Sequence, residues 1–329
     1  MDFQFSDVLL SVLSLVLLAV PGVILGKLKL LPENATKVLT SVLLFIGQPM
    51  LTFTSFQKCA YDATIVNELL IVAGLAILVH AIMIALIFGL FYKKSSNNEK
   101  LRIVSFASIF GNCGFMGLPF LQTLFGSTSS KPLMYGAVVI AVFNAFSWTV
   151  GIFFITRDKK FISPKKAFIN PPFIALLVSL PLFLILKKPI TAIGAEGSFV
   201  NEMFKKIFVS ANYLGELVTP LSMIILGLRL AEIKIKDLFL NGYAYLSSTL
   251  KLVVMPLLAF FICVLLKVPE LIKWAIFFEF CMPTATQTLL FSEQYGNQPH
   301  MASVSVLLAT LVSVATIPLM YLLVSITGL

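Results

Sequence analysis

The stretch FGNCGFMGLPFLQTLFG, residues 110–126, raises the question on which the interpretation of the fold depends. It lies within an apolar run long enough to cross a bilayer, which takes about 20 residues in a helix. Yet it contains the glycines Gly111, Gly114 and Gly117 and the proline Pro119, residue types that weaken or break helices. A membrane-crossing segment therefore carries a break within its own length, and the break calls for a reason.

The composition of the whole chain indicates a membrane protein. Its 329 residues are 59% hydrophobic and 12% charged, against about 45–50% and about 25% in a soluble domain. The mean hydropathy is +0.99. The net charge of +9 comes mostly from short loops, which favours a role in membrane topology and contact with anionic lipid. We expect the lipid bilayer to be a partner and nucleic acid not to be one.

Ten apolar stretches are each long enough to span a bilayer as a helix. All are expected to be helical, because lipid offers no partner to an unpaired backbone group. The loops are short, and no stretch is polar enough to form a soluble domain. The sequence therefore predicts an all-α, multi-pass protein of the cell (plasma or inner) membrane. The expected spans are 8–26, 38–57, 68–92, 103–126, 132–156, 168–187, 207–229, 238–266, 272–293 and 301–326.

Lysine and arginine are distributed unevenly between the loops. The loops after spans 1, 3, 5, 7 and 9 contain 15 of these residues, and the other loops contain 8. Because basic loops tend to stay in the cytoplasm, we expect both termini to be extracytoplasmic. The acidic residues Asp2 and Asp7, which precede the first apolar stretch, are not typical of a secretory signal, so we interpret this stretch as the first span.

Prolines recur at about half the chain length, which indicates an internal repeat. Pro119 in span 4 and Pro283 in span 9, within FFEFCMPTATQTLLF, are 164 residues apart. We interpret residues 1–160 and 161–329 as two five-helix repeats. Because five is an odd number, the second copy would enter the membrane upside down, giving a 5+5 inverted repeat. Further pairs at a similar spacing are Pro49 with Pro220 and Pro21 with Pro181.

Spans 4 and 9 are predicted to be broken helices. Proline removes a helical hydrogen bond but is tolerated as the first residue of a new helix. We expect an extended segment near Gly117 in span 4 and around Met282 in span 9, with the second half-helices beginning at Pro119 and Pro283. Non-helical backbone at that depth persists only where it is buried or lines a cavity, so the two breaks should meet and cross at the midplane. The alternative is a kink in an ordinary packing helix.

Two helix N-termini that meet at one point favour an anion, because each has free N–H groups and a partial positive charge. Broken-helix transporters are built in this way. Gln48 and Asn144 lie on unbroken spans, and each is equally consistent with an interhelical hydrogen bond. The candidate substrate-binding residues are Gln48, Asn112, Gly114, Gly117, Pro119, Asn144, Pro283 and Thr284.

Ionisable residues within spans are candidates for ion or proton coupling, because each is costly in hydrocarbon. Glu279 lies four residues before Pro283 and is expected to carry a proton or, together with Gln287, to bind Na⁺. Its alternative role is a structural pair with Lys251. His80 would titrate near neutral pH unless it is simply hydrogen-bonded in place. No cofactor is expected and no metal site is firmly predicted; Na⁺ near Glu279 is one of the alternatives for coupling.

The sequence argues against an enzyme. It has two histidines, His80 and His300, and no clustered carboxylates, so little is available for acid–base or metal chemistry. It also lacks a G-x-x-x-x-G-K-[ST] motif for ATP. The cysteines show no metal-ligand spacing and are expected to be buried free thiols. They are Cys59, Cys113, Cys263 and Cys281.

Four stretches resemble the auxin efflux carrier family, which includes plant auxin exporters and bacterial permeases. They are GNCGFMGLP in span 4, FEFCMPTATQ in span 9, LGELVTPLSMIILGLRLA in span 7 and NPPFIALLVSLPL in span 6. The loop at 157–167 is short, as in the bacterial members of the family, whereas many plant exporters have a long cytoplasmic loop at this place. The resemblance implies a fold related to the sodium–bile acid symporters, with crossing helices 4 and 9. It places Asn112, Pro119 and Pro283 at the anion site. The plant exporters differ in having a second asparagine just before the proline of span 9, where this sequence reads CMP.

The same resemblance implies a secondary carrier of small organic anions, such as malate, malonate or an auxin-like acid. It further implies a homodimer built through helices 1, 2, 6 and 7, with helices 3–5 and 8–10 as the moving unit of an elevator-type mechanism. Two other functions remain open on this fold: an anion channel, which would pass current without saturation, and a membrane ligand sensor, which would bind without transport.

Overall fold

The computed structural model describes residues 3–32, 34–126, 128–232, 238 and 241–327. Helix is the regular secondary structure throughout these residues, and eight helices in them are long and apolar enough to cross a membrane. They correspond to spans 1, 2, 3, 5, 6, 7, 8 and 10 of the sequence-based prediction. The basic residues Lys234 and Lys236 lie outside the described residues, as do residues 239 and 240 at the start of the expected span 238–266.

Several of these eight helices consist of consecutive helical segments. Their bounds are α1 (Phe5–Lys27), α2 to α3 (Ala35–Lys58), α4 (Ile65–Phe91), α7 to α8 (Lys131–Thr156), Lys159–Ala192 with α9 (Pro164–Phe168) and α10 (Pro171–Leu186), α11 to α12 (Phe199–Glu232), α14 to α15 (Gly242–Leu265) and α18 (Pro299–Ser325). The full set of ten crossings and the inverted repeat stay predictions, because the two remaining segments are each divided into shorter pieces.

The expected span 103–126 is interrupted, but not where the sequence analysis placed the break. α5 (Glu99–Ile109) ends before an extended Phe110, and a π-helical turn, η3 (Cys113–Gly117), leads directly into α6 (Leu118–Phe125). The expectation of an extended segment near Gly117 and of a half-helix beginning at Pro119 is therefore wrong. The wider π turn lets the Leu118 N–H donate to the carbonyl of Cys113, five residues back, so the chain stays helical through the proline.

The same combination occurs at two other prolines. The π turns η1 (Leu43–Gly47) and η7 (Leu250–Val254) are each followed by one residue and then by Pro49 or Pro256. A proline inside a helix clashes with the carbonyl four residues earlier, and a wide turn just before it relieves that clash without ending the helix. These turns also include or adjoin the buried polar residues Gln48 and Lys251.

The expected span 272–293 is interrupted at the predicted place. α16 (Glu270–Cys281) ends before an extended Met282, and α17 (Gln287–Gln294) resumes the helical course. The expectation that the second half-helix begins at Pro283 is wrong, since α17 begins four residues after the proline. The residues between them remain outside the helix because their backbone bonds to the other interruption.

The two interruptions contact each other, as predicted. The Asn112 N–H donates to the Pro283 carbonyl over 2.7 Å, and the Ala285 N–H donates to the Phe110 carbonyl over 2.8 Å. Gly111 and Thr284 thereby form an antiparallel bridge. Each interruption satisfies backbone groups of the other, which is the condition under which non-helical backbone survives at membrane depth.

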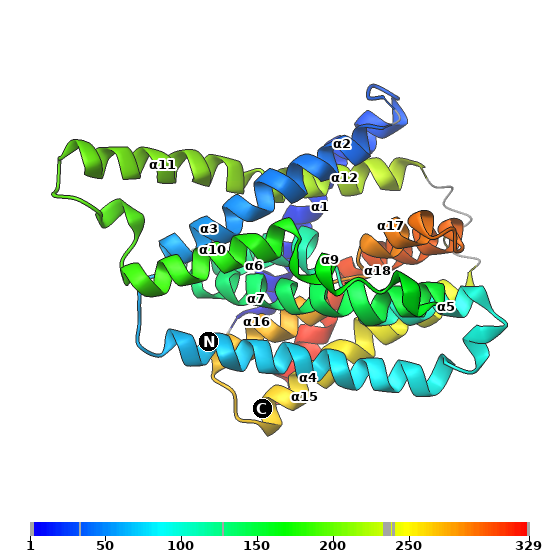
Figure 1. Ribbon diagram of the computed structural model, residues 1–329. Helices are drawn as coiled ribbons and strands as arrows, with labels where there is room; N and C mark the ends of the chain where they lie inside the picture. The colour runs from blue at the N-terminus through cyan, green and yellow to red at the C-terminus, as the bar shows by residue number, and fades with distance from the viewer. Residues whose placement is uncertain (1–2, 33, 127, 233–237, 239–240, 328–329) are drawn as a thin grey trace.

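The helices group into two sets that meet at the interruptions. Figure 1 shows α2, α3, α11 and α12 along one side of the molecule and α4 and α15 along the opposite side. α1 lies against α12 through a contact of two glycines: a Cβ on Gly22 would come 2.1 Å from the Ile224 carbonyl oxygen and 3.0 Å from the Cα of Gly227. Glycine permits this close approach of two backbones in a membrane helix pair.

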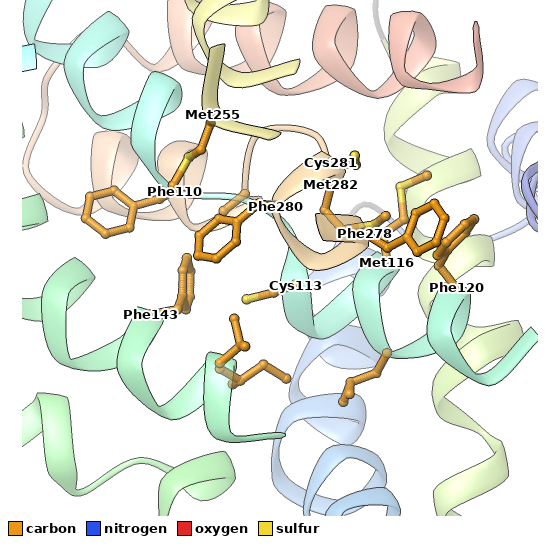
Figure 2. Close-up of a cluster of buried hydrophobic side chains, with 14 of the residues drawn as sticks. Phe110, Cys113, Met116, Phe120, Phe143, Met255, Phe278, Phe280, Cys281 and Met282 are labelled. Atoms are coloured by element: carbon orange, nitrogen blue, oxygen red, sulfur yellow. The ribbon is translucent and has the colours of Figure 1, made fainter. Parts of the chain in front are cut away.

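A cluster of aromatic and sulfur-containing side chains surrounds the interruptions. Figure 2 shows Phe110, Phe143 and Phe280 gathered there, with Cys113 beside them. The rings of Phe110 and Phe143 meet edge to face at 5.8 Å. The four cysteines are free and buried, as predicted. The polar backbone of the two breaks is therefore enclosed by apolar side chains except where a pocket reaches it.

Candidate functional site

A pocket of about 360 Å³ lies against the interruptions and includes Gly111, Asn112 and Ala285 in its lining. The lining includes residues of η1, α10 and α12 and residues of η3, α7 and α17. The volume falls within the range of small-molecule sites, about 300–1,000 Å³. The polar and charged residues of the lining are Thr40, Gln48, Asn112, Asn144, Lys166, Asn170, Arg229, Thr286 and Gln287.

Four of the five side-chain amides of the lining belong to residues predicted from the sequence, and the fifth, Asn170, was not predicted. Gln48, Asn112, Asn144 and Gln287 all line the pocket, as does Gly114. The Gln287 Nε2 donates to Asn144 Oδ1 over 3.4 Å, which leaves Gln287 Oε1 buried and without a partner among the described residues. The amides therefore offer donors and acceptors at the inner end of the pocket.

Gly114, in the π turn η3, makes room for one of these amides. A Cβ on Gly114 would come 2.5 Å from Nε2 of Gln48. Any larger residue at position 114 would push the Gln48 amide out of its place. The close approach explains why a glycine stands here, beyond its helix-weakening character in the sequence.

Two cations of the lining were not among the sequence candidates. Arg229 lies near the end of α12 and Lys166 lies in α9, and both line the pocket. The Arg229 Nε is buried with no hydrogen-bond partner in the described part of the chain. The Lys166 ammonium lies 5.3 Å from the ring centre of Trp148, another lining residue. From the sequence, both residues were interpreted only as determinants of topology. Arg229 lies within the motif of span 7, and Lys166 lies just before the motif of span 6.

Four other sequence candidates lie outside the lining of this pocket. Thr284 is fully buried and donates to the carbonyl of Ala107 over 3.0 Å. The Pro283 carbonyl accepts the bridge hydrogen bond described above. Pro119 is buried in α6, and Gly117 ends the π turn. In this structure these residues hold the interruptions together, and their contact with a substrate stays a prediction.

Glu279 is enclosed beside the first interruption. Its side chain is 2% exposed, and both carboxyl oxygens lack a hydrogen-bond partner among the described residues. A Cβ on Gly117 would come 2.4 Å from Oε2, and one on Gly136 would come 2.7 Å from Oε1. The carboxyl group therefore fits between two glycines. Gln287, expected to join it in a cation site, instead lines the pocket and bonds to Asn144.

Lys251 is fully buried, and in the described residues it forms no ion pair with Glu279. Its ammonium donates to the carbonyl of Phe280 over 3.0 Å. His80 is also buried and lies outside the pocket lining. Its Nδ1 is 2.8 Å from the carbonyl of Ala76, and its ring stacks on Phe146. The histidine is thus held by a helical carbonyl and aromatic rings.

The model of the membrane transport protein family matches residues 7–164 and 155–321. The chain belongs to this family. The match confirms the resemblance to the auxin efflux carriers that the broken-helix motifs indicated. Proteins of the family are membrane transporters, in accord with the apolar helices found here.

Proteins named as transporters are similar over nearly the whole chain. An uncharacterized transporter of Methanocaldococcus jannaschii is 28% identical over 320 residues, which cover 95% of this chain and 96% of the relative. A protein of Rhizobium meliloti named "Putative malonate transporter" is 26% identical over 298 residues, covering 89% of this chain and 88% of the relative. An uncharacterized transporter of Methanothermobacter thermautotrophicus is 24% identical over 315 residues, covering 95% and 96%.

Proposed function

We propose that this membrane transport protein is a secondary transporter of small organic anions with carboxylate groups. The observation that carries the proposal is the pocket at the two helix interruptions, in which Arg229 and Lys166 join five side-chain amides. Arginine and lysine pair with carboxylates through charge-assisted hydrogen bonds. The name of the Rhizobium meliloti relative supports a substrate of the malonate class.

The shape of the pocket supports a small substrate with an apolar part. Its volume of about 360 Å³ exceeds that of a three- or four-carbon acid and leaves room for water. Phe115, Phe143 and Trp148 line it together with the polar groups. The Arg229 Nε has no partner in the described chain, so a substrate carboxylate would satisfy a group that is otherwise buried unpaired.

We further propose that the structure corresponds to a state open towards the cytoplasm. Lys166, Asn170 and Arg229 line the pocket. They lie in or beside the loops after spans 5 and 7, which the basic bias assigns to the cytoplasm. If these loops are cytoplasmic, both termini are extracytoplasmic, and we propose this topology as well.

For the transport movement we propose an elevator mechanism in a homodimer with a 5+5 inverted repeat. Spans 1, 2, 6 and 7 of the sequence-based prediction would form the dimer scaffold, and spans 3–5 and 8–10 would carry the substrate. Asn112, Asn144 and Gln287 belong to the second group, whereas Gln48 and Arg229 belong to the first. The hydrogen bond from Thr219 to Gln122, 3.1 Å long, crosses between the groups and would break during the movement.

For energy coupling we propose a proton carried by Glu279. A Na⁺ ion needs several oxygen ligands, as hard cations do, whereas this carboxyl lies against Gly117 and Gly136 in a site that the side chains of Leu118 and Leu121 also border. An unpaired charge at such depth costs at least about 2.5–3.5 kcal/mol, and protonation removes that cost. The state described here would then hold Glu279 in its neutral form.

The test is exchange of radiolabelled malonate in proteoliposomes containing the purified protein. We expect saturable exchange that unlabelled small dicarboxylates inhibit. Asn112→Ala and Arg229→Gln should weaken apparent affinity by ~1–3 kcal/mol, about 5- to 150-fold. The matched control is Arg102→Gln, which removes an arginine that bonds to the Ser95 carbonyl outside the pocket.

Three outcomes would contradict the proposal. Flux without saturation would indicate a channel, and malonate binding without flux would indicate a sensor. Affinity unchanged in both pocket variants, in correctly folded protein, would remove this pocket as the substrate site.

A further inference from the structure

A lysine ammonium lies where the backbones of the two interruptions meet. Lys251 is 0% exposed and donates from Nζ to the Phe280 carbonyl over 3.0 Å. A Cβ on Gly111 would come 2.8 Å from both Cε and Nζ of Lys251 and 3.3 Å from the Met282 carbonyl oxygen. The ammonium is thus next to the first interruption and near two backbone positions of the second.

The end of α16 gives this place a negative electrostatic potential. The last carbonyls of a helix have no helical partner and carry the negative end of its dipole. α16 ends at Cys281, so the Phe280 carbonyl is one of these groups. In carriers with broken helices, such carbonyls are the ligands of a coupling cation.

No other described neighbour forms an ion pair with the ammonium, although the buried carboxyl of Glu279 is close enough to interact with its charge. In the described residues Lys251 has no carboxylate partner, and its second polar contact is the Met255 Sδ at 3.5 Å. The ring centre of Phe280 lies 6.0 Å away. Backbone dipoles therefore supply the stabilisation that a carboxylate gives a buried lysine elsewhere.

We propose that Lys251 is a tethered cation, whose ammonium occupies the site that the carbonyls at the interruption would otherwise offer to a free monovalent cation. An ammonium is a compact point charge with three donors, and its stem reaches the site from η7 on a neighbouring helix. Two consequences follow. The native protein needs no Na⁺ to hold its interruptions together, and shortening residue 251 creates a site for a small free cation.

This inference concerns the energy source of the proposed carrier and rests on that function for its meaning, but its test needs no substrate. A failure of malonate exchange would therefore count against the carrier and leave the stability result untouched. Conversely, an unfavourable stability result would leave the anion pocket intact.

The experiment measures thermal unfolding of the purified full chain at constant ionic strength. The salts are choline, sodium, lithium, potassium and methylammonium chloride. We expect the wild-type Tm to be the same in sodium and choline. Lys251→Ala should have a lower Tm in choline and regain most of the loss, saturably, in methylammonium or in sodium. Lys251→Met, which refills the volume with an apolar side chain, should show no such gain.

The matched control is Met255→Ala, which opens a cavity against the same ammonium and leaves the charge in place. Its Tm should fall without any dependence on the cation. A sodium-specific rise in the wild-type Tm would overturn the proposal. So would an equal cation effect in Met255→Ala, or a Lys251→Ala chain that stays destabilised or unfolded in every salt.

Discussion

Substituting Gly117 by alanine tests the packing of the buried carboxyl group most directly. The new Cβ would come 2.4 Å from Glu279 Oε2 and 2.9 Å from its Cδ, well inside van der Waals contact. The carboxyl cannot move away freely, because its other oxygen lies over Gly136, where an added Cβ would come 2.7 Å from Oε1. Relief therefore requires a different rotamer of Glu279 or a shift of the π turn.

The expected loss of stability follows from these two routes. A side chain forced off its rotamer costs ~0.5–1.5 kcal/mol, and overpacking of a tight interior costs ~1–3 kcal/mol. Replacing glycine in a helix restores up to about 1 kcal/mol through backbone entropy. We expect a net loss of ~1–2 kcal/mol, measured as a lower Tm in detergent. The control is Gly74→Ala on α4, where the new Cβ meets nothing within 4 Å, and its Tm should stay level or rise.

A double-mutant cycle separates this clash from a general effect on the π turn. Glu279→Ala removes the carboxyl group that the new methyl at position 117 would strike, so in that background Gly117→Ala should cost little or should stabilise by filling space. The coupling between the two changes should reach ~1 kcal/mol or more, as for residues in contact. Equal Tm values for Gly117→Ala and Gly74→Ala, or purely additive effects, would refute the packing described here.

Three further predictions concern packing, coupling and topology. Gly227→Ala places a Cβ 2.1 Å from the Ala19 carbonyl oxygen; because backbone cannot rotate away, the loss should be at least ~1–3 kcal/mol by Tm, and a stability equal to that of wild type would contradict the α1–α12 contact. Glu279→Gln should exchange substrate between liposomes of equal pH and lose acceleration by a pH gradient; a wild-type response to the gradient excludes Glu279 as the proton carrier. Lys160→Cys in a cysteine-free chain should resist an impermeant reagent added to intact cells, and rapid labelling would invert the proposed topology.

The sequence by itself determined the class of the protein and the two apolar segments in which the helix is interrupted. Hydropathy sets the helices, because lipid leaves backbone groups no partner outside a helix. The pairing of Pro119 with Pro283 located the two interrupted segments. The polar residues beside them, above all Asn112 and Gln287, identified much of the pocket, because polar groups in an apolar run are costly and need a reason.

Only the tertiary structure decided the chemistry around the breaks. The first break lies at Phe110 to Asn112 because those backbone groups bond to the other interruption, while a π turn carries the helix through Pro119. The separation of Glu279 from Lys251 and the arrival of Arg229 in the pocket depend on contacts between distant helices. Helical periodicity indicates which residues can be buried. The partner of each buried group depends on how the helices pack against one another, which the local sequence does not encode.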